Sequence, residues 1–295
     1  MGRKQVELVQ RGAFAVYPLV LLLAIGAAAA DSLDWADDLD EALSRAQAEG
    51  KLVLLVLESE LCPWCVKLTE ETLTAEAVTT HRERFVAVKV SVADQPELGT
   101  RYARRGVPQS VFLTGEGRQV GKVEGFVPAT IFAARMRDAW AARDLPAEIA
   151  NFEATRESRP LDAQELARLG RLYVATGQEQ KAEPVLEQAL EQASQLDNAT
   201  AAGARLDLLI ARLPAQDGEL APELVNWLET NAQHARVVEA QYYAGYALAL
   251  KGEGQTALAL WAKVIAATPE STCGVLAAYY TQFVREAMQR RSNGG

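Results

Sequence analysis

The four residues Cys62-Pro63-Trp64-Cys65 constrain the fold of this chain more than any other short segment. An apolar, β-rich run with the length of a buried strand precedes them, from Lys51 to Leu57. A stretch rich in Lys, Glu and Leu, typical of a helix, follows from Val66 to Leu73. Pro63 suits a first helical position, where its missing N–H would have no partner. We therefore predict that the cysteines lie at a helix start, where the dipole and free N–H groups favour the thiolate form.

Other chemistries of paired cysteines fit the sequence less well. A c-type haem site needs His directly after the second Cys, and position 66 is Val. A structural zinc site needs four ligands, but the chain adds only Cys273, His81 and His234, none of them close to the pair in sequence. The pattern favours a redox-active dithiol that needs no cofactor and no metal. A metal site and a plain structural disulfide are the alternatives, and both histidines are expected to be surface or packing residues.

Residues 1–30 are typical of a targeting segment. A basic start at Arg3, Lys4 and Arg11 is followed by an apolar stretch that ends in three alanines before Asp31, as at a signal-peptidase site. The apolar stretch is long for a signal peptide, so an uncleaved N-terminal anchor is an alternative. In both cases the chain after Asp31 is expected to be exported, which in a bacterial cell means the periplasm.

Charge and composition indicate two acidic domains. Residues 1–30 hold three basic residues and Glu7, a net charge of +2, so their removal changes the formal charge from −9 to −11. An acidic chain argues against nucleic acid as a partner. Strand-like runs stop near Arg143, and Ala, Leu, Glu and Gln dominate from there on. We predict an α/β domain over 31–143, a linker over 144–160 and an all-α domain over 161–291.

Within the first domain, hydrophobic periodicity predicts the order α-β-α-β-α-β-β-α. A helix follows Trp35 and ends at Gly50, and further helices are expected to be capped by Thr74 and Asp94. The expected strands are 51–57, 85–90, 110–113 and 120–124, and the last helix is 129–141.

This order, with three local matches, resembles the thioredoxin fold, a central mixed sheet flanked by helices. The matches are the Cys62–Cys65 motif after a buried strand, Gly106-Val107-Pro108 just before a strand, and a glycine-turn hairpin that runs to Gly125-Phe126. Within that superfamily the segment is most similar to the periplasmic C-terminal domain of DsbD-type thiol:disulfide interchange proteins. The resemblance implies that Pro108 is a cis-proline facing the dithiol and that the Val107 backbone pairs with substrate. An ordinary trans proline entering an edge strand is the alternative.

The resemblance also implies roles for the motif residues. Cys62 would attack a substrate disulfide, and the less exposed Cys65 would resolve the mixed disulfide. Pro63 and Trp64 would support the site, Trp64 either as a partly exposed platform beside the sulfur or as a simple packing residue.

One position departs from the thioredoxin pattern. Thioredoxin carries a buried Asp six residues before the first cysteine, where it assists proton transfer, and this chain has Val56 there. Glu58, and less so Glu60, are the nearest carboxylates in sequence, and each is either a proton acceptor for Cys65 or a solvated charge. The redox potential and the direction of electron flow are left open by these residues.

The all-α part repeats itself at an offset of 75 residues, with small residues at helix crossings and a Gly at the turn. It resembles tetratricopeptide (TPR) repeats, with a degenerate middle unit over 199–213 and 219–231 and a capping helix over 275–288. The concave surface of such an array is expected to bind a protein partner, and a stabilising or dimerising appendage is the alternative. Cys273 is expected to be a small, buried free thiol, with a second redox role or an intermolecular disulfide as alternatives. The repeated pairs are Gly170/Gly245, Tyr173/Leu248, Gly177/Gly252, Ala182/Ala257, Leu186/Trp261 and Ala189/Val264.

Together these patterns predict an exported thiol:disulfide oxidoreductase, a reductase or maturation factor, whose helical repeats recruit protein partners. Its upstream redox donor is left open. The alternative from a different class is a non-catalytic scaffold whose thioredoxin-like domain only recognises proteins.

Overall fold

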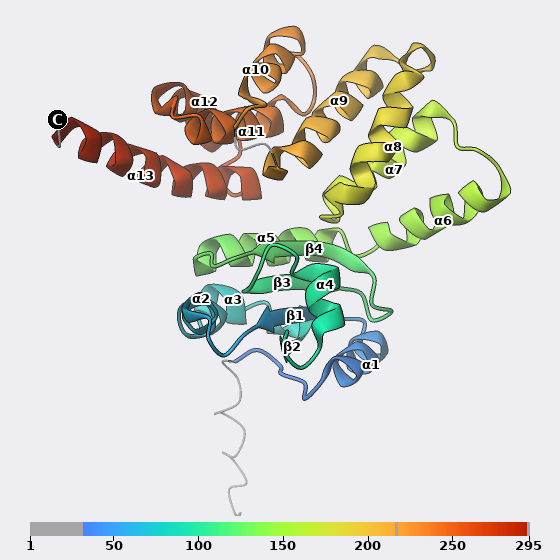
Figure 1. Cartoon of the computed structure of the whole chain (residues 1–295), viewed down its shortest axis with the longest axis vertical. Helices are drawn as coiled ribbons and strands as arrows, with labels where there is room; N and C mark the ends of the chain where they lie inside the picture. Colours follow the sequence, from blue (N-terminus) through green and yellow to red (C-terminus); the bar gives the residue numbers. More distant parts are fainter. Residues whose placement is uncertain (1–31, 216–217, 294–295) are drawn as a thin grey trace, which may run out of the picture. The chain divides into compact units, whose positions relative to one another are not determined.

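The computed structural model describes residues 32–215 and 218–293, drawn in colour in Figure 1. The predicted targeting segment, 1–30, lies outside the described residues. Within the described ranges, none of the helices combines the length and the apolar composition needed to cross a bilayer.

The N-terminal part is built on a four-stranded sheet with the strand order β2-β1-β3-β4 (Figure 1). β1 and β2 are parallel, whereas β3 pairs antiparallel with both β1 and β4. β1 is central, and its residues from Leu52 to Leu57 are all buried. The predicted strands are confirmed to within two residues at each end. Their bounds are β1 Leu52–Glu58, β2 Phe85–Ser91, β3 Gln109–Leu113 and β4 Gln119–Glu124.

The helices of this part follow the predicted order, with corrected starts. The first helix begins at Leu39, four residues after the predicted start at Trp35, because Asp38 caps it. Gly50 ends it in the left-handed conformation at φ 66°, as expected of a C-cap glycine. The predicted caps Thr74 and Asp94 are wrong by one residue each, since Ala75 and Gln95 hold those positions. Pro96 explains the second shift, because a proline disfavours helical backbone in the residue before it. The helices are α1 Leu39–Glu49, α2 Pro63–Lys67, α3 Glu76–Thr79, α4 Pro96–Tyr102 and α5 Ala129–Ala141, with a 3₁₀ turn η2 at Arg82–Arg84.

The two faces of the sheet carry separate cores. Leu54 and Val56 of β1 point to one face, where Leu68 from the helical segment after the cysteines and Met136 from α5 pack on them. Leu55 and its alternate neighbours point to the other face, which α1 and α4 cover. This alternation is the period of two expected for a strand buried on both faces.

The segment 144–160, predicted to link the two domains, contains helix α6 (Leu145–Ser158). Ile149 of α6 is buried, and Glu148 accepts two hydrogen bonds, of 2.7 and 2.8 Å, from the Arg168 guanidinium. The segment is therefore ordered helix, and the domain boundaries themselves stay a prediction.

The C-terminal part is entirely helical within the described residues and consists of three helix pairs and a final helix. This arrangement follows the predicted hairpins, the middle pair included. The helices are α7 Ala163–Ala175, α8 Glu179–Glu191, α9 Asn198–Arg212, α10 Ala221–Thr230, α11 Val237–Leu250, α12 Gly254–Ala267 and α13 Thr272–Asn293, with 3₁₀ turns η3 Ala193–Gln195 and η4 Leu213–Ala215.

The pairs α7–α8 and α11–α12 are built alike, as the 75-residue offset predicts. A Cβ on Gly170 would overlap the Leu186 side chain, and a Cβ on Gly245 would lie 2.5 Å from Trp261 Nε1. The turn glycines Gly177 and Gly252 have φ values of 70° and 89°. Glycine is thus required twice in each hairpin, once where the helices cross and once at the turn.

Helix α5 contacts both parts of the chain. Its Ile131 belongs to the hydrophobic cluster formed by α9 to α13, whereas Phe132 faces the sheet core. Arg137 donates a hydrogen bond of 3.4 Å to the carbonyl of Glu270, and Thr272 donates one of 3.4 Å to that of Ala134. The helical part therefore uses some of its surface to hold α5.

Candidate active site

Cys62 and Cys65 lie at the point where β1 ends and α2 begins, as predicted. Cys62 is the N-cap residue of α2, with extended backbone angles, and Pro63 is the first helical residue. The two cysteines form a disulfide, and their Cα atoms are 5.3 Å apart. The backbone N–H of Cys65 donates to Cys62 Sγ at 3.1 Å. An N–H group directed at this sulfur stabilises negative charge on it, so in the reduced form the position favours a Cys62 thiolate.

Exposure distinguishes the two sulfur-bearing residues. Cys62 is partly exposed, whereas Cys65 is only 3% exposed. Cys65 stands three residues before Leu68, so both side chains lie on the helix face that packs against the sheet. An incoming protein can therefore reach Cys62 and not Cys65.

The loop before β3 brings backbone next to the exposed sulfur. The Val107–Pro108 peptide bond is cis, and the carbonyl oxygen of Val107 lies 3.6 Å from Cys62 Sγ. Pro108 is buried, and its own carbonyl accepts a hydrogen bond of 2.9 Å from the N–H of Gly125 at the end of β4. The loop that holds Val107 and Pro108, predicted to pair with substrate, therefore lies beside the dithiol.

Four apolar side chains and one lysine, close to Cys62 in sequence or in contact with Trp64, form a surface set that we call the rim. Trp64 is 57% exposed, and its ring centroid lies 5.8 Å from that of Phe126. Lys67 Nζ lies over both rings, at 5.5 and 4.8 Å. Leu61 and Val66 are 93% and 51% exposed. The rim consists of Leu61, Trp64, Val66, Lys67 and Phe126.

The helical segment that continues α2 is hydrogen-bonded to the chain next to Phe126 of the rim. This segment, η1 (Leu68–Leu73), is a π-helix, a rare form that recurs near functional sites. Its buried Thr72 donates a hydrogen bond of 2.7 Å to the carbonyl of Val127, next to Phe126. The sequence interpretation did not assign Leu61, Val66, Lys67 or Phe126 to the site. The sequence offered one signal for these residues: Leu61 and Val66 are apolar and directly flank the reactive motif.

The carboxylates predicted as proton acceptors make no hydrogen bond to the dithiol within the described residues. Glu58 is the last residue of β1 and is partly exposed, and Glu60 is exposed. Within the described ranges, neither side chain makes a hydrogen bond or an ion pair. Val56 is buried in the core beneath the motif. A role for Glu58 therefore stays a prediction.

The remaining cysteine and the histidines lie apart from the motif. Cys273 is a free thiol near the start of α13, as predicted, but the residue is partly exposed rather than fully buried. Burial, and to a lesser degree Glu239, raises its pKa to about 12. Burial and the charge of Arg84 lower the pKa of His81. His234 packs edge-on against Trp227 at 5.2 Å. Across residues 32–215 and 218–293, no cluster of three metal-ligating side chains occurs.

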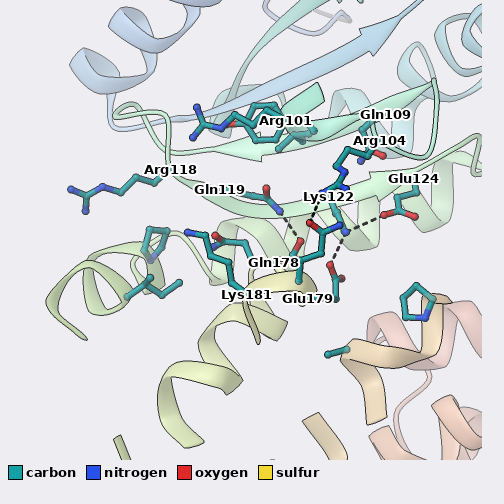
Figure 2. Close-up of a pocket in the computed structure, with 18 of the residues that line it drawn as sticks. Arg101, Arg104, Gln109, Arg118, Gln119, Lys122, Glu124, Gln178, Glu179 and Lys181 are labelled. Carbon is teal, nitrogen blue, oxygen red and sulfur yellow. Dashed lines mark hydrogen bonds and ion pairs between the residues drawn. The ribbon is translucent and has the colours of Figure 1, made fainter. Parts of the chain in front are cut away.

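A polar groove lies along β4, between α4 and the turn that joins α7 to α8. Figure 2 shows Lys122 at its centre, with ion pairs to Glu124 at 3.0 Å and to Glu179 at 2.7 Å. Gln119 donates hydrogen bonds of 2.9 Å to the carbonyls of Thr176 and Gly177. The central cation is thus already neutralised, and these contacts fix β4 to the first helical pair.

The family comparison decides the nature of the N-terminal part. Residues 39–140 match the family model for thioredoxin-like domains. This part of the chain is a thioredoxin-like domain. The match covers the sheet, the dithiol and the Val107–Pro108 loop, and it leaves the helical part without an assignment.

Individual relatives match about a third or somewhat more of the chain. The thiol:disulfide interchange protein DsbD of Cronobacter sakazakii is 31% identical over 108 residues, which cover 35% of this chain and 18% of DsbD. A thioredoxin from Thermus thermophilus, known from its solution structure, is 35% identical over 36% of this chain and 85% of its own, with a TM-score of 0.33. A structure of the DsbH oxidoreductase is 21% identical over 41% of this chain and 94% of its own, with a TM-score of 0.34. The chain therefore spans less than a fifth of the length of DsbD.

Proposed function

We propose that this chain is an exported protein-disulfide oxidoreductase that exchanges disulfides with partner proteins through Cys62 and Cys65. The observation that carries the proposal is the position of Cys62 Sγ. Cys62 is partly exposed, and its Sγ lies 3.1 Å from the backbone nitrogen of Cys65 in the first turn of α2 and 3.6 Å from the Val107 carbonyl oxygen. The bonded partner, Cys65, is buried directly beneath it.

In the reducing direction, the Cys62 thiolate attacks one sulfur of a substrate disulfide. The substrate S–S bond breaks, its other sulfur leaves as a thiolate and takes up a proton, and a mixed disulfide forms on Cys62. Cys65 then loses its proton and attacks Cys62 Sγ, which releases the second substrate sulfur as a thiolate. Two electrons pass to the substrate, and the Cys62–Cys65 disulfide remains. A dithiol protein must reduce it again, and the same steps in reverse oxidise a substrate dithiol.

The surroundings of the sulfur favour a protein substrate. Exposed apolar groups of the rim offer a contact surface to another protein. The Val107 backbone lies next to the sulfur and is available to an extended substrate segment, the role expected for it and for Pro108. Trp64 and Pro63 support this arrangement, as a surface for the substrate and as the first helical residue.

The helical part and the N-terminal segment complete the proposal. We assign the helical pairs to TPR-like repeats that bind a protein partner, supported by the glycine crossings repeated 75 residues apart. The basic and apolar pattern of residues 1–30 supports export to the periplasm, either as a cleaved protein or on an N-terminal anchor.

A trapping experiment tests the exchange function. A Cys65→Ser variant, expressed in a bacterium with the native N-terminus, is expected to accumulate mixed disulfides with periplasmic proteins, visible on non-reducing gels. The bands should disappear in the Cys62→Ser, Cys65→Ser double variant and persist when Cys273→Ser is added to Cys65→Ser. The wild type should reduce insulin. Absence of both adducts and insulin reduction would favour the non-catalytic scaffold.

A further inference from the structure

Ser110 is an anomaly in the core of the thioredoxin-like domain. Its side chain is 1% exposed, and its hydroxyl has no hydrogen-bond partner among the described residues. The other buried polar side chains of this domain, Thr72, Thr79 and Gln109, all donate hydrogen bonds to backbone carbonyls. A buried hydroxyl without a partner is unfavourable, so its presence calls for an explanation.

Strand register places Ser110 beneath the dithiol. Ser110 of β3 pairs directly with Val56 of β1 and with Val123 of β4. Directly paired residues share one face of a sheet. Val56 and Val123 belong to the core that also contains Leu68, one helical turn after Cys65. The Ser110 hydroxyl therefore lies on the face that the cysteine helix covers.

Its position along the strand is also the one closest to the motif. Val56 is the last buried residue of β1 on this face before the chain turns through 59–61 to Cys62. Ser110 is level with it, two residues after Pro108. Among the three residues paired at this level of the sheet, Val56, Ser110 and Val123, only Ser110 has a polar side chain.

The chemistry of Cys65 requires a polar group at this place. Cys65 must become a thiolate to resolve the mixed disulfide, and burial in an apolar core opposes that charge. The Val56 side chain cannot form a hydrogen bond, and the Glu58 side chain makes none within the described residues. A hydroxyl cannot serve as a base at neutral pH, but it can donate a hydrogen bond to an anion.

We propose that Ser110 donates a hydrogen bond to the Cys65 sulfur in the reduced protein and thereby stabilises its thiolate. In the disulfide form described by the structure, the Cys65 sulfur is bonded to Cys62 and carries no charge, and the hydroxyl is left without a partner. Once the bond is broken, the two sulfurs move apart to non-bonded contact, and the buried one gains a negative charge when it ionises. The inference rests on the proposed exchange function.

The test compares two buried hydroxyls. Thr281 Oγ1 in α13 is likewise buried without a partner among the described residues, and it lies in the helical part. Ser110→Ala and Thr281→Val each remove one such group, and both variants are expected to be folded and no less stable, since an unpaired buried polar atom is lost. The matched pair separates an effect on Cys65 from a general effect of removing a hydroxyl.

The readout is the pH titration of the Cys65 thiolate by ultraviolet absorbance in a Cys62→Ala background. Cys273 stays protonated across this range, because its pKa is raised to about 12. Ser110→Ala is expected to lower the Cys65 thiolate population at neutral pH about tenfold, the loss of one hydrogen bond to a charged group. Thr281→Val should leave the titration unchanged, and Ser110→Thr, which keeps the hydroxyl, should retain most of the thiolate.

Two results contradict the inference: an unchanged titration in Ser110→Ala, or an equal change in Thr281→Val. Should Ser110→Ala fail to fold, the comparison of Ser110→Thr with Ser110→Val gives the same answer at closer side-chain volume. A shifted titration without insulin reduction by the wild type would remove the proposed function and keep this inference. Insulin reduction by the wild type with an unshifted titration in Ser110→Ala would keep the proposed function and remove this inference.

Discussion

The chain has two cysteine sites at helix starts, and they differ in almost every property that controls thiol chemistry. Cys62 caps α2, is partly exposed, receives an N–H at 3.1 Å and is bonded to a second cysteine. Cys273 is the second residue of α13, is a free thiol, and has a pKa raised to about 12 by burial. Both residues are partly exposed. A helix start and partial exposure therefore do not by themselves produce a reactive thiol; a directed donor and a resolving partner do.

Removal of the cysteines separates the two sites most strongly. Cys62→Ser is expected to lower the rate of insulin reduction on the order of a thousandfold or more, because no other residue can form the mixed disulfide. Cys273→Ser should leave the rate within about twofold of the wild type. Turbidity assays with dithiothreitol as donor measure both. Comparable losses in the two variants would mean that Cys273 belongs to the redox pathway.

Alkylation of the reduced protein compares the two thiols directly. With a pKa of about 12, Cys273 is a thiolate in only about one molecule in 10⁵ at pH 7. Cys62 is therefore expected to react with iodoacetamide at least about a hundredfold faster, and the Cys273 rate should rise about tenfold per pH unit. Peptide mapping by mass spectrometry gives both rates. Protein unfolded in denaturant is the control, where both thiols should react alike.

Substitutions at the glycines of the helical part are expected to change the free energy of unfolding rather than the redox activity. Gly245→Ala would place a Cβ 2.5 Å from Trp261 Nε1, and such overpacking should destabilise the protein by about 1–3 kcal/mol. Gly203→Ala in α9 is the matched control, because the nearest atom to its Cβ would be 3.9 Å away. Added helix propensity should make that variant neutral or more stable by up to about 1 kcal/mol. Urea titration measures both, and the reverse order would disprove the hairpin packing.

The smallest expected effect is a pH dependence. The pKa of Cys273 is raised from 9.0 to about 12 in the folded protein, so its contribution to stability is complete below pH 9 and is lost as pH rises towards 12. Tyr243 is partly buried, and desolvation raises its pKa as well, which acts in the same direction at higher pH. Between pH 8 and 10 the wild type should lose about 1 kcal/mol more than Cys273→Ala. Parallel stability curves for the two proteins would contradict this assignment.

Local patterns predicted most of the fold. The strand 85–90 and the helix 129–141 were readable because apolar residues recur at the periods of a strand and a helix. The helix within the predicted linker 144–160 was not evident from the sequence, since Pro146 occupies the first turn of α6. Proline is tolerated there, so the same residue marks both a loop and a helix start.

The site was predictable where the chemistry is local and not where it depends on tertiary contacts. Cys62 and Cys65 were evident from four consecutive residues. The role of the Val107–Pro108 loop was predicted from the resemblance to thioredoxin. Phe126 reaches Trp64 only because β4 ends beside α2, and Ser110 lies under the dithiol only through the pairing of β3 with Val56. Neither contact leaves a signal in a single sequence.

Exchange of electrons between the Cys62–Cys65 dithiol and a protein disulfide can be measured most directly by mass spectrometry. Reduced protein is mixed with a peptide that holds one disulfide, and the products are quenched in acid. The wild type should end with the Cys62–Cys65 disulfide and one equivalent of reduced peptide, whereas Cys65→Ser should stop at a peptide adduct on Cys62. An unreacted peptide, or an adduct on Cys273, would contradict the proposed exchange.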